Sequence, residues 1–564
     1  MNRRTFLSSF APRVNLAPIP EQQTLGLEPY EGVWNNQTAA HLLRRTTFGI
    51  RANEISQIVS MGMDAAVAQL LTAPTGNGQP INYYAGGDGL VSLGNSWVPP
   101  AIVNEFYEFG RLNSVKLWIF NRMLTRNLTV YDKMVLFWHN HFVVEAASVG
   151  SSAMLYKYFN TIDQNTLGNF KTMTLAISRT PAMLRYLNGE YNSAVAPDEN
   201  YARELQELFT VGKGADAQFT EADVQAAAKV LTGYRINPLD HTQWFFNGFE
   251  HDSTNKQFSP FYSNTIINGQ TGEYGQYELN AMLDMIFAVP EVAKFLCRKL
   301  YRFFVYYQIT PDIETNVIEP LADVFRDYNY EILPVLETLF KSQHFYDSWN
   351  YACYIKSPLD YTLGLCRSFD IAFWSGVSNN IFYQNWQVAN ANRLKCCDVF
   401  HDRAAQTAME IGQHPNVSGW PAYYQEPMFN EVWINADTYS KRMELAHQLC
   451  QNGIGSGYLE FSTPSNVTLK INLTGFAQSL TQPGDPNTLV SETLERLYSY
   501  PVDAEFTDYL KSFLLSGTTD DYYWTSAWNN YISAPNNASY KAIVETRLRN
   551  MLEYMLTQPE YQLM

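Results

Sequence analysis

Apolar residues recur three and four positions apart along most of this 564-residue chain, and this spacing restricts its fold more than any other feature. Such a period indicates helices with one buried face, whereas strands alternate every two residues. The pattern predicts helices over residues 38–45, 52–71, 102–123, 130–141, 182–187, 221–231, 279–304, 317–326, 332–340, 357–369, 488–498, 504–515 and 541–556. We therefore expect a mainly α fold, with a large multi-helix body, long irregular loops and a smaller helical C-terminal region.

Short signals mark where two of these helices begin. Thr180 precedes Pro181, and a cap residue followed by proline at the first helical position is typical of a helix start. Thr220 and Asp223 have the spacing of a capping box, in which each side chain bonds to the backbone N–H of the other residue. Gly233 is expected to close the helix that follows.

Two stretches lose the helical period. Residues 76–100 are rich in Gly, Asn and Pro and predict a loop. Residues 235–277 collect Asn, Gly, Ser and aromatic residues, and so long a segment inside a compact domain is usually functional or decorated with short strands. We interpret it as a functional loop.

The predicted organisation is an arm or degenerate signal over 1–36, a main helical domain over 37–345, and a C-terminal helical region over 346–564 packed on it.

The composition narrows the class of protein. Hydrophobic residues make up 46% of the chain, charged residues 17% and aromatic residues 15%, which excludes a disordered chain. The net charge of −16 lacks the basic footprint of a nucleic-acid binder, so we expect no nucleic-acid partner. No run approaches the roughly 18 apolar residues of a membrane span. The six cysteines form no C-x-x-C pair, and the neighbours Cys396 and Cys397 are expected to be ordinary residues.

The first residues raise the question of export. Asn2-Arg3-Arg4-Thr5-Phe6-Leu7 resembles a twin-arginine export signature. Arg13 and prolines at positions 12, 18 and 20 interrupt the segment that follows, which therefore lacks the apolar stretch of roughly 7 to 15 residues of a secretion signal. The alternatives are a degenerate signal and a polar arm lying over the fold. We expect an exported protein, in the periplasm, at the cell surface or outside the cell.

Two histidines stand near the end of an apolar helix. His139 and His141 are two residues apart, which places them on nearly opposite sides of a regular helix. They can share a ligand only if the helix ends or unwinds there. The alternative is that each is a hydrogen-bonded core residue.

A pair of carboxylates occupies one face of a second predicted helix. Asn200, Arg203, Glu204 and Glu207 recur at spacings of three and four, so they lie on one face if the segment is helical. Two neighbouring carboxylates can share a metal or divide into an acid and a base, because each raises the pKa of the other. The alternative is a solvated face of ion pairs.

The third group is His251-Asp252, which is followed by Lys256 inside the irregular segment. A histidine beside a carboxylate can supply a ligand pair or a base with its orienting group, or Asp252 can simply cap a turn. The nitrogen and oxygen donors of the three groups suit zinc or another divalent ion. The sequence has no H-E-x-x-H, G-x-S-x-G, P-loop or G-x-G-x-x-G motif.

Several ordered motifs resemble the bacterial domain-of-unknown-function family 1800. They are 39–49 (AAHLLRRTTFG), 133–142 (KMVLFWHNHF), 199–210 (ENYARELQELFT), 219–224 (FTEADV), 231–234 (LTGY), 251–252 (HD) and 415–421 (PNVSGWP). The likeness spans roughly residues 37–562. It implies a largely helical, often exported protein, frequently encoded beside sulfatase-like or phosphatase-like secreted proteins, and it implies no particular activity. It also implies that the His139/His141, Glu204/Glu207 and His251/Asp252 positions match polar motifs of the family.

Two functions from different classes remain open. The first is a metal-assisted hydrolase of a cell-envelope or extracellular polymer. Its predicted groups are the metal ligands His139, His141, His251 and Asp252, the ligand or general base Glu204 and Glu207, and the oxyanion or substrate partner Arg203. This hypothesis requires His139, Glu204 and His251 to converge. The second is a binding or assembly component, which contacts a glycan or another envelope protein through aromatic-rich loops at 244–246, 258–262 and 522–524.

Overall fold

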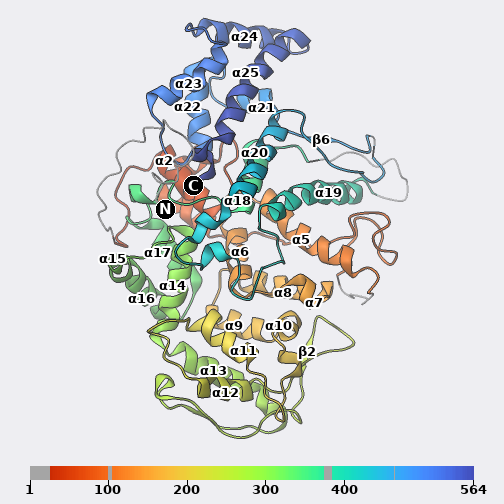
Figure 1. Cartoon of the computed structure of the whole chain (residues 1–564), viewed down its shortest axis with the longest axis vertical. Helices are drawn as coiled ribbons and strands as arrows, with labels where there is room; N and C mark the ends of the chain where they lie inside the picture. Colours follow the sequence, from red (N-terminus) through yellow and green to blue (C-terminus); the bar gives the residue numbers. More distant parts are fainter. Residues whose placement is uncertain (1–25, 99–104, 374–383, 463) are drawn as a thin grey trace.

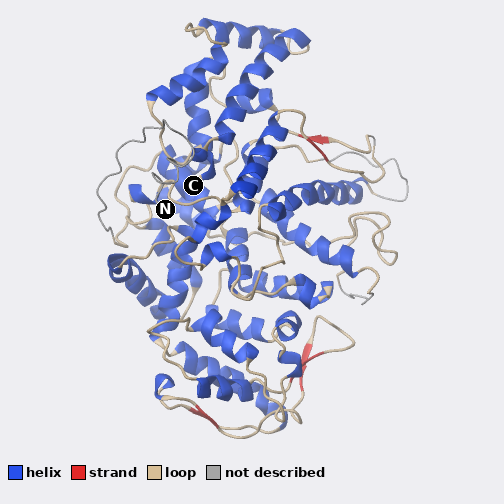
Figure 2. Cartoon of the chain, viewed as in Figure 1, coloured by secondary structure: helices blue, strands red, loops and turns tan. Residues whose placement is uncertain are grey.

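The computed structural model describes residues 26–98, 105–373, 384–462 and 464–564. It is mainly α, as the periodicity predicts, and its strands are short and lie at the periphery (Figures 1 and 2). The molecule is elongated in Figure 1, with α23, α24 and α25 at one end of the long axis and α12, α13 and β2 toward the other. Helices α6 and α18 lie between these ends.

The first half of the chain forms the helices that carry His139, His141, Arg203, Glu204 and Glu207. Their bounds are α2 Asn36–Thr46, α3 Glu54–Met61, α4 Met63–Leu70, α5 Glu108–Thr125, α6 Tyr131–His141, α7 Ala146–Val149, α8 Ser152–Asn165, α9 Phe170–Ser178, α10 Pro181–Tyr186, α11 Asn200–Glu204, the π-helix η2 Leu205–Thr210, and α12 Glu221–Val230. The predicted helix over 52–71 is two helices, because Gly62 adopts a φ of 76° between them. Residues 99–104, at the start of the predicted helix over 102–123, lie outside the described residues.

The local start signals have mixed outcomes. The capping box at Thr220 and Asp223 is present and begins α12. Pro181 is the first residue of α10, but Thr180 makes no capping bond, since its hydroxyl donates to the carbonyl of Ile177 instead. Gly233 follows α12 with a φ of 92°, in the left-handed region that favours glycine.

The irregular segment 235–277 contains short strands and single helical turns. Strand β1 Tyr234–Ile236 pairs antiparallel with β2 Trp244–Phe246, with Tyr234 opposite Phe246. Strand β3 Lys256–Gln257 pairs antiparallel with β4 Ile266–Ile267, and the turns are η3 Pro260–Tyr262 and η4 Gly272–Tyr277. Hydrogen-bonded pairs thus hold the segment in place at two points.

The second half of the chain is again helical. Its elements are α13 Glu278–Phe287, α14 Pro290–Phe304, α15 Pro311–Ile313, η5 Glu314–Ile318, α16 Glu319–Asp327, α17 Ile332–Lys341, α18 Pro358–Ser368, α19 Asn385–Gln406, α20 Ala436–Cys450, β5 Ile454–Gly455, β6 Thr468–Leu469, α21 Leu473–Gln478, α22 Pro486–Leu497, α23 Ala504–Leu515, α24 Tyr522–Ser533 and α25 Ala538–Thr557. The predicted helix over 279–304 is divided at Pro290, which cannot continue α13. Residues 522–524, expected to lie in an aromatic-rich loop, instead begin α24.

The buried apolar side chains form one connected cluster that runs from Ala39 to Leu563. Every residue of α18 is buried, so this helix passes through the interior. A buried ion pair between Lys133 of α6 and Asp360 ties α6 to α18. None of the described helices combines the length and apolar character needed to cross a lipid bilayer. No disulfide joins any of the six cysteines, all of which lie in the described residues.

Helices α2 and α18 approach each other through glycine. Gly49 follows α2 with a φ of 98°, and a Cβ added there would lie 2.6 Å from the Cα of Gly364 in α18. That separation is well below normal contact distance, so a side chain at position 49 would push the two segments apart.

Part of the predicted N-terminal arm packs on the body. The backbone N–H of Tyr30 donates to the carbonyl of Lys341 at 2.8 Å, and that of Gln343 donates to the carbonyl of Glu28 at 2.8 Å. Residues 1–25, which carry the predicted export signature, lie outside the described residues.

Candidate functional site

His139 lies near the end of α6, and both of its ring nitrogens form hydrogen bonds inside the protein. Its Nδ1 is 2.9 Å from the hydroxyl of Tyr158, which itself donates to the carbonyl of Phe142, so Nδ1–H is the donor to Tyr158. Its Nε2 accepts the backbone N–H of Gly412 at 3.0 Å. Burial, with the charges of His414 and Lys116, holds the pKa of His139 well below its usual range. This neutral imidazole has no free lone pair for a metal.

His141 is on another side of α6, and both of its ring nitrogens also contact polar atoms of the protein. Its Nε2 is 3.0 Å from the carbonyl of Phe209 in η2, and its Nδ1 is 3.1 Å from the Nζ of Lys299. Lys299 also donates to the carbonyl of Leu208 at 3.0 Å, and burial lowers its pKa to about 7. His141 therefore joins α6, η2 and α14, and its buried ring has a pKa well below the usual range.

The predicted carboxylate pair lies at the junction of α11 and η2. Arg203 donates to Glu199 at 3.1 Å, contacts Glu221 more closely, and is 3.8 Å from Glu207. Lys213 is 2.7 Å from Glu207. Glu207 is therefore neutralised by cations. The Oε2 of Glu204 has no partner among the described residues, and burial, followed by the charge of Glu207, raises the pKa of Glu204.

His251 forms a buried network with residues on both sides of it in the chain. Its Nδ1 is 3.0 Å from both the carbonyl and the hydroxyl of Thr232, and its Nε2 is 3.1 Å from Oε1 of Glu278. The other oxygen of Glu278 accepts from Lys256 at 2.6 Å. A Cβ at Gly275 would lie 2.3 Å from the His251 ring, so only glycine fits beside it.

Asp252 does not orient His251. Its Oδ1 accepts the N–H of Thr254 at 2.8 Å, and its own N–H donates to the hydroxyl of Thr232. Asp252 therefore caps a local turn, which is one of the alternatives that its position in the sequence predicts.

The three predicted groups thus occupy three separate networks. In the part of the chain that the structure describes, His139, Glu204 and His251 do not form a group whose ligand atoms one ion could join. The described structure therefore does not bring these three side chains together around one ion, and His139 and His251 have other, nearer partners. His139 and His251 instead fix tertiary contacts, as a buried polar network does.

A different set of residues does converge. Asp398, His401 and Asp402, which we name the α19 triad, lie three and four residues apart on α19, and their ligand atoms are all within 4.8 Å of one another. His401 is 2% exposed, and its Nε2 has no partner among the described residues. Burial, followed by the charge of Lys116, lowers the pKa of His401 to about 3.

The surroundings of the α19 triad come mainly from α5. The amide of Asn113 donates to Asp398 at 3.1 Å, and Lys116 is 2.6 Å from Oε1 of Glu410. Burial raises the pKa of Asp398, and burial together with the charge of Glu410 raises that of Asp402. The site therefore combines several carboxylates with the nearby cations Lys116, Lys395 and Arg403.

The spacing of these residues in the sequence could have predicted this triad. Asp-x-x-His-Asp places three donors on one helical face, provided that the segment is helical. Helix α19 was not predicted, because its buried residues, from Val388 to Ala404, are not restricted to one narrow stripe.

The comparisons with known proteins agree with the motifs. A family profile described as "Protein of unknown function (DUF1800)" matches residues 41–563, nearly the whole chain. No curated protein and no solved structure gave a significant match. The matched region contains the α19 triad and all three predicted groups. The chain belongs to the DUF1800 family.

Proposed function

We propose that the protein binds a divalent metal ion at the α19 triad and uses it to hydrolyse an envelope or extracellular polymer. The observation that carries the proposal is the convergence of three ligand atoms within 4.8 Å, one of them from a buried histidine with an unpartnered Nε2 in the described structure. A buried imidazole nitrogen without a partner is costly, and a metal ion would satisfy it.

The donor set suits a borderline or hard cation. Two carboxylates and one imidazole are ligands for zinc and manganese. Burial is the main cause that raises the pKa of both Asp398 and Asp402, and a neighbouring carboxylate adds to it, Asp402 for Asp398 and Glu410 for Asp402. A bound dication would relieve the repulsion between these carboxylates.

The arrangement also leaves room for chemistry. All three donors come from one face of one helix, so they would occupy one side of an ion and leave the other side for water and substrate. Asp402 is exposed and Asp398 is half-buried, so the site opens to solvent. A metal ion at such a site lowers the pKa of bound water to about 7 and thereby supplies hydroxide for hydrolysis.

Metal analysis of the purified protein tests the proposal directly. We expect about one zinc or manganese ion per chain, released by a chelator and bound again on addition of either ion. Asp402→Asn should weaken binding by at least about tenfold, whereas Asp437→Asn on α20, which removes another exposed carboxylate, one paired with Lys441, should not. Absence of metal binding by the wild-type protein at micromolar ion would exclude this centre.

Hydrolysis requires a separate assay. The probes are p-nitrophenyl acetate and bis(p-nitrophenyl) phosphate, measured with the metal-loaded protein and after chelation. Turnover that depends on metal and is lost in Asp402→Asn supports a hydrolase. Metal binding with no turnover of these probes or of isolated cell-wall polymer would reject the hydrolase and leave a metal-binding protein.

A second function, a non-catalytic binding component for a glycan or another envelope protein, is favoured by exposed aromatic side chains. Phe249 is fully exposed, and Tyr274 and Tyr277 are largely exposed, all in the segment 235–277. Tyr522 of α24 is 67% exposed at the opposite end of the molecule (Figure 1). Of the aromatic groups named from the sequence, Phe246, Phe258, Tyr262 and Trp524 are instead buried.

Sedimentation with insoluble cell-wall glycan tests this alternative. Binding that falls in Phe249→Ser, and that persists in the presence of a chelator, would support a binding component. Leu333→Ser, which removes an exposed apolar residue of α17, is the control. Equal sedimentation of both variants and the wild type would reject a role for this segment.

A further inference from the structure

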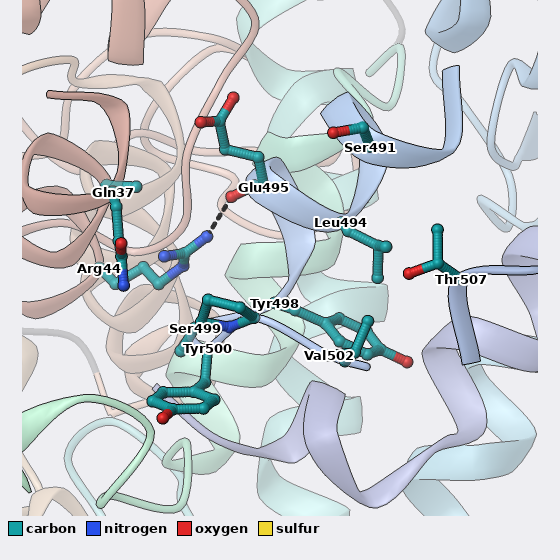
Figure 3. Close-up of a pocket in the computed structure, with 12 residues that line it drawn as sticks. Gln37, Arg44, Ser491, Leu494, Glu495, Tyr498, Ser499, Tyr500, Val502 and Thr507 are labelled. Carbon is teal, nitrogen blue, oxygen red and sulfur yellow. Dashed lines mark hydrogen bonds between the residues drawn. The ribbon is translucent and has the colours of Figure 1, made fainter. Parts of the chain in front are cut away.

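Two neighbouring cavities share one buried arginine, Arg44 of α2. The outer cavity has a volume of about 300 Å³ and lies between α2, α22 and the start of α23 (Figure 3). The inner cavity, of about 30 Å³, is lined by Arg44, Lys356, Asp360 and Arg496 among other residues. The outer volume is that of a small-molecule site, whereas the inner one holds only water or a small ion.

Arg44 enters this space without a carboxylate partner. It is 8% exposed, and its Nη2 donates to the backbone carbonyl of Glu495. The carboxylate of Glu495 is turned away from it in Figure 3 and accepts from the amide of Asn36 at 3.2 Å. Among the described residues, no carboxylate lies within ion-pair distance of Arg44. Burial lowers the pKa of Arg44 to about 10.

Two further cations line the inner cavity. Lys356 donates to the carbonyl of Tyr561 at 2.6 Å and lies 3.7 Å from the centre of its ring. Arg496 is 8% exposed; its Nη1 donates to Ser479 at 2.9 Å, and its Nε has no partner among the described residues. Neither side chain is in an ion pair within the described structure.

The carboxylate of the inner cavity is already committed. Asp360 forms an ion pair with Lys133 and accepts the hydroxyl of Ser357 at 2.8 Å. Two buried arginines and the half-buried Lys356 therefore line the cavities, and the carboxylate beside them, Asp360, is paired with Lys133. Burying charge without a counter-charge is unfavourable, so this region is suited to an anion supplied from outside.

The walls of the outer cavity decide which anion fits. Leu494, Tyr498 and Val502 present apolar surface, and Ser491 and Thr507 supply hydroxyl groups (Figure 3). An inorganic ion alone would leave most of a 300 Å³ space unfilled. A guanidinium group in a restricted pocket favours carboxylate and phosphate, whose paired oxygens match its planar donors.

We propose that the outer cavity binds a small organic anion, with its carboxylate or phosphate head group at Arg44 and its apolar body along Leu494, Tyr498 and Val502. The cations of the inner cavity add to the positive potential at the head group. This site is separate from the α19 triad and does not depend on metal binding.

Isothermal titration of the full chain with phenyl phosphate, benzoate, phenol and inorganic phosphate tests the proposal. We expect phenyl phosphate, benzoate or both to bind one to one and more tightly than phenol and inorganic phosphate, and the tighter of the two identifies the head group. Raising the salt concentration should weaken binding. Failure of both organic anions to bind, or equal binding of phenol, would overturn the proposal.

Variants locate the site. Arg44→Gln should weaken binding of the better probe about tenfold or more, and Arg44→Lys should recover part of that loss because it keeps the charge but not the planar fork. Ser491→Trp places a large side chain at an exposed cavity-lining position of α22 and should block binding even if the Arg44 variants fold poorly. Ser539→Trp, on an exposed position of α25 outside the cavity, is its control. Unchanged binding in Ser491→Trp would overturn the assignment to this cavity.

Discussion

The Nε2 atom of His139 accepts a hydrogen bond from the backbone N–H of Gly412, a residue 273 positions further along the chain. The contact joins the end of α6 to the loop that also carries Glu410, whose carboxylate is held by Lys116. A histidine that resembles a metal ligand in the sequence thus fixes the loop next to the α19 triad.

Replacement of His139 should therefore lower the free energy of unfolding and leave the metal content of the protein unchanged. His139→Ala leaves the hydroxyl oxygen of Tyr158 and the N–H of Gly412 without their buried partner, and we expect a loss of about 3 kcal/mol in the free energy of unfolding. Urea titration measures this loss, and metal content per folded chain should not change. His447→Ala, which removes a largely exposed histidine, should change stability by less than about 1 kcal/mol. Loss of metal from folded His139→Ala would contradict this role.

Stability should fall as the pH drops below the ordinary pKa of histidine. Burial is the main cause that lowers the pKa of His41, His139, His141, His401 and His414 in the folded protein. The unfolded chain binds protons at these positions near pH 6.5, while the folded chain stays neutral there. Each group thus stabilises the fold above that pH, and each costs up to about 1.4 kcal/mol per pH unit below it. Unfolding measured at about pH 7.5 and 5.5 checks the sign; equal stability at both values would contradict it.

The buried network around His251 should be sensitive to loss of its carboxylate. Glu278→Gln removes the nearer carboxylate of buried Lys256, at 2.6 Å, and leaves only Asp252 at 3.9 Å, so we expect a loss of about 3 kcal/mol. The matched control is Asp284→Asn, which breaks an ion pair with Lys171 that is far more exposed and should cost less than about 1 kcal/mol. Thermal unfolding of the two variants compares the pairs, and a similar effect of both would show that Glu278 is not needed to compensate Lys256.

Glu204 should behave in the opposite way. Because burial and the charge of Glu207 raise its pKa, its ionised form is less favourable in the folded state than in the unfolded state. Glu204→Gln should therefore preserve or increase the free energy of unfolding at pH 7, and the gain should shrink as the pH approaches 4, where the native carboxyl is protonated. Chemical unfolding at both pH values tests this. Strong destabilisation at pH 7 would indicate a partner for the carboxylate that the described residues do not supply.

The fold was largely predictable, because most helices bury one face. The ranges 130–141 and 332–340 nearly coincide with α6 and α17, whose apolar residues alone set the pattern. Helices α8, α9, α19, α20 and α24 were not predicted. In α24, Trp524, Trp528 and Tyr531 do form a buried stripe, but exposed Tyr522 and Tyr523 beside it gave the segment the composition of a loop.

The site was less predictable than the fold, because its partners are distant in the chain. His141 is held by Phe209 and Lys299, and His251 by Thr232, and no local spacing reveals such contacts. Polar residue types in a motif showed where buried networks lie but not whether they bind an ion. The α19 triad, by contrast, is local, and recognising α19 as a helix would have been enough to find it.

Gly49 and Gly364 both line the inner cavity, but the close contact between them makes Gly49 much less tolerant of substitution than Gly364. A methyl group at Gly364 would meet no atom within 4 Å, whereas one at Gly49 would collide with the backbone of α18. Alanine at position 364 would occupy part of the inner cavity and leave the helices where they are. Alanine at position 49 would move α2 relative to α18, and with it the distance between Arg44 and Lys356. The distance between Arg44 and Lys356 thus depends on the absence of a side chain at Gly49. We therefore expect selection to act against replacement of Gly49.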